Sequence, residues 1–194
     1  MFSLTLLGLD NRTSESCAEI TLATHIKQVV EYIEARNLQS VTLVGHSYSG
    51  VVVGAVADRI PTRITRLLLI EAALPVHGQS VLQSNGNNVR EETRLIRENR
   101  GFWPHPNREE LRHEPHLTPA QKDYLLTHFK PHPGRTVTEP VQLSQSTLQT
   151  LSLWLGRELP AAAKRGALAN LEFASLDSGH WPMLSKPEEI IRYF

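Results

Sequence analysis

The sequence predicts an α/β fold with a predominantly parallel sheet and flanking helices. Short apolar runs alternate with stretches of helical period through residues 1–74, and the same alternation returns in residues 136–194. A turn of small residues joins the apolar run Val41–Val44 directly to a helical stretch. Strands separated by helices in this order imply right-handed crossovers, so the strands of the sheet should run parallel.

The first part of the core should contain three strands and two helices. A helix is expected to begin after Thr21, which can cap it, and to end near Asn37, because apolar residues between them recur with helical spacing. The other expected elements are a strand at Phe2–Leu7, a polar loop at Asp10–Glu19, a fully buried strand at Val41–Val44, a helix at Val51–Ile60 stopped by Pro61, and a strand at Ile64–Ala72.

Residues 75–135 differ from the rest, because apolar positions are sparse and Pro, His, Asn and Arg are frequent. We expect a mostly helical cap inserted into a single domain whose core is 1–74 and 136–194. Inside the cap, helices are expected at Val89–Asn99 and from the N-cap Thr118 to Phe129. The second part of the core should contain a helix near Val141–Ser146, a strand at Thr150–Leu155, a helix from Leu159 or Pro160 to Leu168, and a strand at Leu171–Leu176.

Composition excludes several classes of function. The 194 residues include 20 basic and 20 acidic side chains, so the formal net charge is zero and favours neither nucleic acid nor an anionic membrane surface. The single cysteine, Cys17, cannot form an internal disulfide. The apolar start Met1–Leu7 lacks a basic region and is too short to span a bilayer. We therefore expect a soluble cytoplasmic protein with no membrane or nucleic-acid partner.

The turn after Val41–Val44 is the first candidate for chemistry. Ser47 lies where a buried strand meets a helix, a position that holds a side chain out at the carboxyl edge of a sheet. Strand and helix must approach each other closely there, and we interpret the small residues Gly45, Ser49 and Gly50 as a steric requirement of this approach. The backbone N–H of Tyr48, at the start of the helix, would stabilise an oxyanion.

A base for this serine is expected from the other end of the chain. His180 follows the expected strand Leu171–Leu176, and parallel strands end at the same sheet edge. Serine is a weak nucleophile that needs an imidazole within hydrogen-bond reach, and the order of serine before histidine is that of hydrolases. We predict Ser47 Oγ and a ring nitrogen of His180 to lie within, or slightly beyond, about 3 Å of each other.

The chain resembles the α/β-hydrolases of the small esterase type, in particular the plant methylesterase and hydroxynitrile lyase group and its bacterial relatives. The matching stretches cover nearly the whole chain: Thr5–Leu9, Thr24–Ile26, Val44–Tyr48, Glu71–Pro75, His132–Pro133 and Ser178–Met183. The resemblance implies Ser47 as nucleophile, His180 as base, a helical lid, small-molecule ester substrates, and neither a metal nor an organic cofactor. The lyases carry lysine directly after the histidine, where this chain has Trp181, which favours ester hydrolysis.

The acid of the expected triad has three candidates. In the resembled family a carboxylate follows the strand that is Thr150–Leu155 here, which makes Glu158 the first choice. Glu71, at the end of the preceding core strand, is the alternative. Asp177 is the weakest, because it lies on the segment of the histidine itself. The uncertain acid leaves a second function open, that of a hydrolase-fold binding protein without catalysis.

Aromatic side chains and histidines are assigned by their position. Phe102 and Trp103 in the cap, together with Trp181, are expected to contact substrate, whereas Trp154 in a core strand should pack. The cap histidines His105, His113, His116, His128 and His132 are expected to be loop residues, because only His113 and His116 have ligand-like spacing and the stretch has no cysteine.

The start of the chain departs from the resembled family. Members begin with a strand and a His-Gly loop that supplies the second oxyanion N–H, so about 35 residues are expected to be missing, enough for a strand and a crossover. The missing strand would lie between Phe2–Leu7 and Val41–Val44. Either these two segments pair directly, or a slot stays open between them, or the natural polypeptide is longer; a truncated start is expected, with low stability and weak activity.

Overall fold

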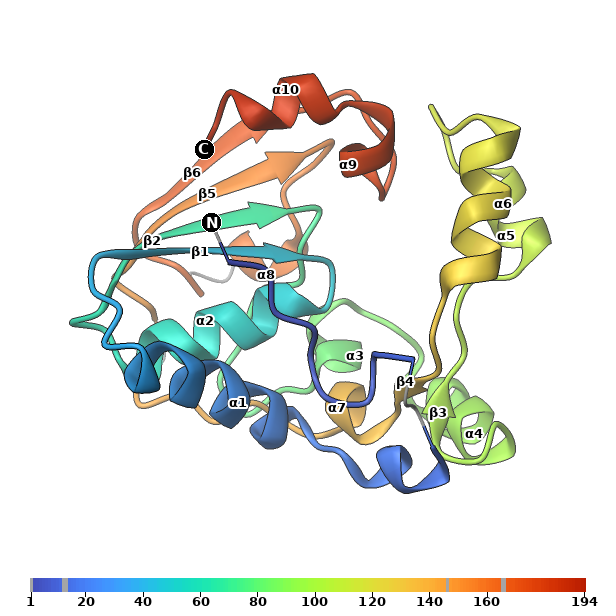
Figure 1. Cartoon of the computed structure of the whole chain (residues 1–194), viewed down its shortest axis with the longest axis horizontal. Helices are drawn as coiled ribbons and strands as arrows, with labels where there is room; N and C mark the ends of the chain where they lie inside the picture. Colours follow the sequence, from blue (N-terminus) through green and yellow to red (C-terminus); the bar gives the residue numbers. More distant parts are fainter. Residues whose placement is uncertain (1, 12–13, 146, 165–166) are drawn as a thin grey trace.

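A computed structural model of the chain describes residues 2–11, 14–145, 147–164 and 167–194. Its main sheet has the strand order β1-β2-β5-β6, and every pair in it is parallel. Helices α1 and α2 cover one face of the sheet, and α9 and α10 lie on the other face (Figure 1). The arrowheads of the strands point toward the side where α5 and α6 stand, so the carboxyl edge of the sheet faces the cap.

The strands of the main sheet are β1 Val41–His46, β2 Ile64–Ile70, β5 Leu151–Gly156 and β6 Leu171–Ser175. A second, antiparallel pair within and beside the cap joins β3 Phe102–Trp103 to β4 His132–Pro133. The helices are η1 Glu15–Glu19 (a 3-10 helix), α1 Leu22–Ala35, α2 Ser49–Arg59, α3 Val81–Ser84, α4 Val89–Glu98, α5 Arg108–Arg112, α6 Pro119–His128, α7 Arg135–Thr138, α8 Ala161–Lys164, α9 Pro182–Ser185 and α10 Pro187–Ile191.

Two helices begin where their caps predict. The Thr21 hydroxyl accepts the backbone N–H of Thr24 at 3.1 Å and starts α1, and Thr118 caps α6 in the same way, with Pro119 in its first turn. Helix α1 ends at Ala35, and Asn37 follows with a φ of 48°, a conformation that Asn tolerates better than most residues. These expectations from local sequence are confirmed.

Apolar packing covers both faces of the sheet. The larger cluster lies between the sheet and the helices α1 and α2, and includes Ile26, Val56 and Leu67, none of which is more than 2% exposed. A smaller cluster covers the other face, where Leu68 and Leu155 pack with residues near α10. A third cluster lies in the cap. Burial of this kind supplies most of the driving force for folding.

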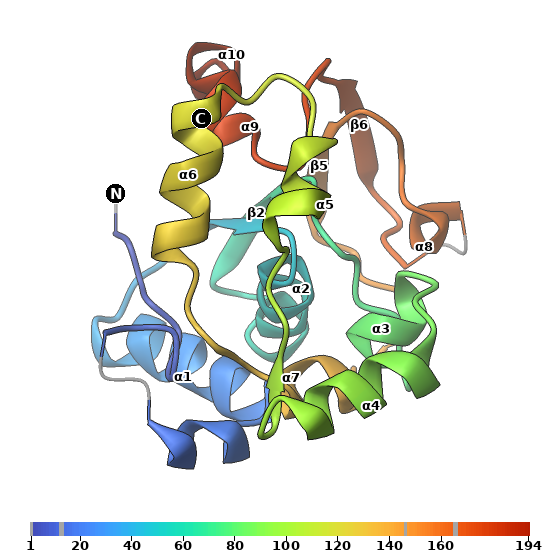
Figure 2. The same cartoon turned by 90° about the vertical axis from the view of Figure 1, so that its right-hand side faces the viewer.

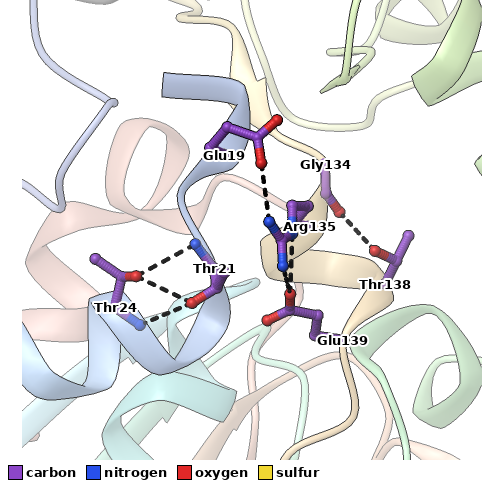
Figure 3. Close-up of polar contacts among 7 residues, drawn as sticks. All are labelled: Glu19, Thr21, Thr24, Gly134, Arg135, Thr138 and Glu139. Carbon is purple, nitrogen blue, oxygen red and sulfur yellow. Dashed lines mark hydrogen bonds and ion pairs between the residues drawn. The ribbon is translucent and has the colours of Figure 1, made fainter. Parts of the chain in front are cut away.

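The lower part of the cap is attached to the N-terminal region by polar contacts. Figure 3 shows Arg135 of α7 between two carboxylates, with N–H groups donating to Glu19 at 2.9 Å and to Glu139 at 2.8 and 3.0 Å. In the same view the Thr138 hydroxyl donates to the carbonyl of Gly134 at 3.2 Å. These contacts join η1, α7 and the segment that follows it.

The expected first strand is absent. Residues 2–6 form neither strand nor helix, and the Gln28 side chain of α1 bonds two backbone groups of this segment. Its amide accepts the N–H of Leu7 at 3.0 Å and donates to the carbonyl of Thr5 at 3.0 Å. The segment does not pair with β1, which is an edge strand of the described sheet and in which Val44 is 40% exposed. The expectation of a fully buried strand at Val41–Val44 was wrong for the same reason.

Three further expectations need correction. Residues 141–145 form no helix, and Ser146 lies outside the described residues. The helix expected to reach Leu168 is the single turn α8, which ends at Lys164, and residues 165 and 166 are outside the described part. The polar loop Asp10–Glu19 ends in η1, with residues 12 and 13 outside the described ranges. Each of these segments is short and depends on distant contacts more than on its own periodicity.

Candidate active site

A strained turn presents Ser47 at the carboxyl end of β1. Ser47 has a φ of 51°, in the left-handed region that costs a residue other than glycine roughly 1 kcal/mol or more. Its carbonyl accepts N–H groups from Gly50 at 3.1 Å and Ala73 at 3.0 Å, and its own N–H donates to Ile70. Bonds to the next strand and to the following helix therefore hold the turn in this conformation.

Small residues permit this approach of strand and helix. A side chain at Gly50 would collide with the backbone carbonyl of Ala73. A Cβ on Gly45 would lie 2.8 Å from Val53 and 3.0 Å from the backbone nitrogen of Gly50. Both positions therefore exclude any larger residue without a shift of the turn. This agrees with the steric reason predicted from the sequence.

Ser49 does more than remain small. Its hydroxyl accepts the backbone N–H of His46 at 2.9 Å and donates to the carbonyl of the same residue at 2.7 Å. These two groups lie on the edge of β1 that faces away from β2. Ser49 thus supplies hydrogen bonds to the end of an otherwise open strand edge.

His180 lies beside Ser47, on the loop between β6 and α9. Its Nε2 is 2.9 Å from Ser47 Oγ, in agreement with the separation predicted from the sequence. Two contacts hold the loop: His46 Nε2 donates to the carbonyl of His180 at 2.6 Å, and a carboxylate oxygen of Glu114 accepts the backbone N–H of His180. Burial, helped by the neighbouring His46, lowers the pKa of His180 to about 4. The imidazole is therefore neutral at pH 7 and free to accept a proton.

The three candidate acids occupy different environments. Glu158 is exposed on the loop after β5. Asp177 has a side chain that is 85% exposed and lies 3.3 Å from His116. Glu71, with a φ of 43°, is partly buried at the end of β2. Within the described ranges, no carboxylate accepts a hydrogen bond from Nδ1 of His180.

Glu71 and Glu114 form a pair of carboxylates next to the His180 loop. The backbone N–H of Arg157 donates to Glu71 at 2.7 Å. Burial raises the pKa of the Glu71 carboxyl, and the nearby charge of Glu114 adds to the rise, against the opposing effect of the Arg157 hydrogen bond. Sequence reasoning missed Glu114, because it lies in a cap loop between α5 and α6 with no motif around it.

Tyr48 follows the serine and immediately precedes α2, so its N–H has no acceptor within the helix. Its side chain is buried, and its hydroxyl lies 2.9 Å from Nδ1 of His25. Nε2 of His25 lies 2.8 Å from the carbonyl of Leu7, which can only accept. Nε2 therefore carries the hydrogen, and Nδ1 accepts from Tyr48. Burial lowers the pKa of His25, which keeps this neutral form.

A cavity of about 1060 Å³ opens onto Ser47, and we call it the β1 cavity because β1 forms one wall. Its volume lies just above the range of about 300–1000 Å³ that is typical of small-molecule sites. Phe2–Leu6 form the opposite wall, and Trp103 and His132 lie near the end that contains Ser47. The cavity is lined mostly by apolar side chains.

The expected substrate contacts divide into three cases. Trp103 lines the β1 cavity, and its indole N–H donates to Glu92 at 2.8 Å. Phe102 is buried at 7% exposure and does not line the β1 cavity, because the pairing of β3 with β4 turns neighbouring side chains to opposite faces. Trp181 packs edge-on against the ring of His180 and joins the apolar cluster of the cap. Trp154 packs in the core, as predicted.

Within residues 2–11, 14–145, 147–164 and 167–194, no three His, Cys, Asp or Glu side chains are grouped so that they could hold a metal ion. No helix in the described part of the chain has the length and apolar character needed to cross a bilayer.

Comparison with known sequences gives one family and one curated relative. The model of the family described as "Alpha/beta hydrolase family" matches residues 2–193. A carbendazim hydrolyzing esterase from Nocardioides sp. (strain SG-4G) is 45% identical over 75 residues, which are 39% of this chain and 31% of that esterase. The match therefore spans less than a third of the length of the relative.

Solved structures of low sequence identity share the fold. An extracellular alpha/beta-hydrolase from a Paenibacillus species, described as sharing structural and functional homology with tobacco Salicylic Acid Binding Protein 2, has a TM-score of 0.75 at 21% identity, over 91% of this chain and 80% of that one. A pyrethroid hydrolase from Sphingobium faniae JZ-2 has a TM-score of 0.66 at 18% identity, over 97% and 81%. The parallel α/β fold expected from the sequence is confirmed.

Proposed function

The chain belongs to the alpha/beta hydrolase family, and from this membership we propose that it hydrolyses carboxylic esters of small molecules, with Ser47 as nucleophile. The observation that carries the proposal is the 2.9 Å contact between Ser47 Oγ and Nε2 of a neutral His180, at the mouth of an apolar cavity. The esterase activity named for the 45% identical relative supports the same reaction class.

The proposed reaction proceeds through an acyl-enzyme. His180 Nε2 takes the proton of Ser47 as Oγ attacks the ester carbonyl, and the N–H of Tyr48 stabilises the oxyanion that forms. The bond from carbon to the alcohol oxygen then breaks, and His180 returns the proton to the leaving alcohol. Water repeats the sequence on the acyl-enzyme and releases the carboxylic acid. No cofactor is required for these steps.

For the orienting acid we propose Glu71, ahead of Glu158. Glu71 lies at the end of the strand next to β1, and Ala73, two residues later, bonds the backbone of Ser47. Glu71 is partly buried, and the charge of Glu114 contributes to its raised pKa. The Glu114 side chain in turn accepts the backbone N–H of His180. We expect Glu71→Gln to lower kcat tenfold or more. Glu158→Gln, an exposed change, should leave kcat within about twofold, and the reverse order would return the role to Glu158.

A second candidate function is small-molecule binding without turnover. Among the described residues, no carboxylate accepts a hydrogen bond from Nδ1 of His180. An imidazole without such a bond is a poorer base, and this favours the second function. Under this alternative the β1 cavity binds a ligand, whereas Ser47 forms no covalent intermediate.

The deciding experiment combines labelling with burst kinetics. We expect a fluorophosphonate probe to label the protein, and p-nitrophenyl acetate to release a stoichiometric burst of p-nitrophenol. Ser47→Ala should abolish both. Ser40→Ala is the matched control, because Ser40 has the same φ of 51° but is exposed at the other end of β1. Labelling that survives in Ser47→Ala, or a protein that binds esters without any burst, would reject the proposal.

A further inference from the structure

The part of the cap that stands at the carboxyl edge of the sheet contacts the core through the segment that carries His180. We call residues 107–129, with α5 and α6, the upper cap, and residues 177–185, with α9, the base segment. Figure 2, which views the molecule from the cap side, shows α6 beside α9. Among the described residues, every hydrogen bond and ion pair that leaves the upper cap ends on the base segment, at Asp177, His180 or Leu184.

The apolar contacts of the upper cap follow the same route. Leu111, Leu117 and Leu125 form the buried cluster of the cap. Trp181 and Leu184 of the base segment pack against this cluster. Displacement of the upper cap would expose these side chains to water, which is unfavourable, so the upper cap and the base segment are held together.

Glu114 makes the contact of the upper cap that lies closest to the chemistry. Its carboxylate accepts the backbone N–H of His180. Gly179 leaves room for this contact, because a Cβ there would collide with the carboxylate and lie 3.0 Å from the carbonyl oxygen of Pro115. On the other side, His46 Nε2 donates to the carbonyl of His180 at 2.6 Å. The backbone of His180 is therefore bonded by the cap at its N–H and by the end of β1 at its carbonyl.

These backbone bonds matter because the ring of His180 has little support of its own. Among the described residues, its hydrogen-bond partner is Ser47 Oγ at 2.9 Å, and no carboxylate bonds Nδ1. The direction of the ring is then set by the backbone that carries it. A displacement of about 1 Å between reacting groups can lower a rate about a hundredfold, even when its cause lies outside the chemistry.

We propose that Glu114 is a positioning residue, which fixes the backbone of His180 from the cap so that Nε2 reaches Ser47 while the upper cap is docked on the base segment. The inference rests on the proposed ester hydrolysis, in which His180 is the base. Glu114 acts through His180 and needs no contact with the substrate. The upper cap thereby completes the geometry of the base in addition to covering the edge of the sheet.

The first test compares three variants on p-nitrophenyl acetate. Glu114→Ala should lower kcat at least about tenfold and leave KM within about twofold, because His180 acts in the chemical steps and not in binding the ester. Glu114→Gln keeps an acceptor oxygen for the N–H and should stay within about threefold of the unaltered protein. Glu109→Ala is the matched control, since its side chain also lies in the upper cap and is 62% exposed.

The second test needs no turnover. The ¹⁵N chemical shift of His180 Nε2 reports its contact with the hydroxyl of Ser47. Ser47→Ala should change this shift in the unaltered protein and in Glu114→Gln. In Glu114→Ala the same change at Ser47 should have no effect, because the ring no longer reaches the hydroxyl. If Glu114→Ala does not fold, Glu114→Asp replaces it, since a side chain one methylene shorter withdraws the acceptor from the N–H.

Several outcomes would overturn the positioning role. One is a kcat for Glu114→Ala within about threefold of the unaltered protein, and another is an equal loss in Glu114→Gln. A loss that burst titration traces to a smaller fraction of active protein would indicate a folding defect and would reject the role as well.

Failure of the proposed function would be recognised separately. In that case p-nitrophenyl acetate is not turned over by the unaltered protein and Ser47 is not labelled by the fluorophosphonate. The chemical shifts then decide the inference: a dependence on Ser47 that is lost in Glu114→Ala upholds it, and a dependence that persists in Glu114→Ala rejects it.

Discussion

At the scale of single residues, the candidate site depends on histidines kept neutral by burial. His180 faces Ser47, His46 bonds the carbonyl of His180, and His25 bonds Tyr48. Burial is the largest cause of the lowered pKa of all three. A neutral imidazole has one nitrogen that donates and one that accepts, so each ring can connect two defined partners. The serine turn is thereby connected to the loop of His180 and to the N-terminal segment.

The first prediction concerns the pH dependence of turnover. Because the pKa of His180 is lowered to about 4, its base form is present throughout the neutral range. We expect kcat/KM for p-nitrophenyl acetate to rise with pH through about pH 4 and to be level above about pH 6. The reaction can be followed at the isosbestic wavelength of p-nitrophenol. An apparent pKa of 6.5 or higher would show that the imidazole is not buried in the working enzyme.

The second prediction is that His25 and Tyr48 stabilise the fold as a coupled pair. His25→Leu removes one hydrogen bond of the buried Tyr48 hydroxyl and the bond to the Leu7 carbonyl, which should lower the free energy of unfolding by about 1–3 kcal/mol. Tyr48→Phe should cost less, and the double variant less than the sum of the two. Urea unfolding of the four proteins measures the coupling. Strict additivity would contradict a direct bond.

At the scale of elements, a helix cap and a pair of surface ion pairs lie in the same region of the molecule, which Figure 3 shows. Thr21 caps α1 through a bond to the N–H of Thr24, and the Thr24 hydroxyl accepts in turn from the N–H of Thr21. Arg135, half-exposed, pairs with the more exposed Glu19 and with Glu139. Although the ion pairs involve more atoms, water screens them, whereas the cap satisfies a donor that the helix itself cannot.

The third prediction follows from this difference. Thr21→Ala should lower the free energy of unfolding by about 1 kcal/mol, and Arg135→Ala by less than that. Raising the salt concentration should reduce the effect of Arg135→Ala and leave that of Thr21→Ala unchanged, because screening acts on the ion pairs alone. Urea denaturation at low and high salt makes the comparison. A larger loss from Arg135→Ala would mean that η1 and α7 depend on these charges.

At the scale of the whole molecule, buried histidines should make the fold sensitive to acid. The pKa of His132 is lowered to about 3 and that of His180 to about 4, in both cases chiefly by burial, and those of His25 and His46 are lowered as well. In the unfolded chain these groups titrate near 6.5. Between the two values the unfolded state binds more protons than the folded state, so stability falls as pH decreases.

The fourth prediction is therefore a fall in Tm between pH 7.5 and pH 4.5. His132→Gln should make the fall smaller, because it removes a histidine whose pKa burial lowers to about 3, and the glutamine can still donate to Thr136, as Nε2 of His132 does at 2.8 Å. His113→Gln is the control, since its side chain is 78% exposed. Scanning calorimetry at several pH values gives the slopes. Equal slopes for the two variants would place the origin of acid sensitivity elsewhere.

Much of the fold could be predicted from local sequence. The caps at Thr21 and Thr118, the strand β2 and the turn around Ser47 each have a strong signal within a few residues. The proximity of Ser47 and His180, 133 positions apart, could also be predicted, because all strands of a parallel sheet end at one edge. The sequence by itself thus determined the parallel α/β architecture and the two side chains that meet.

Only the tertiary structure decided what depends on distant neighbours. The apolar run Phe2–Leu7 has the composition of a strand, but a strand needs a partner strand, and this segment is bonded instead by the Gln28 side chain of α1. Of the adjacent Phe102 and Trp103, only Trp103 lines the β1 cavity. The pairing of β3 with β4 directs their side chains to opposite faces. Glu114 lies in a cap segment that contains no motif, and only the fold brings its carboxylate to the backbone N–H of His180. Hydrogen-bond partners and burial come from segments far apart in the chain, and local periodicity does not contain them.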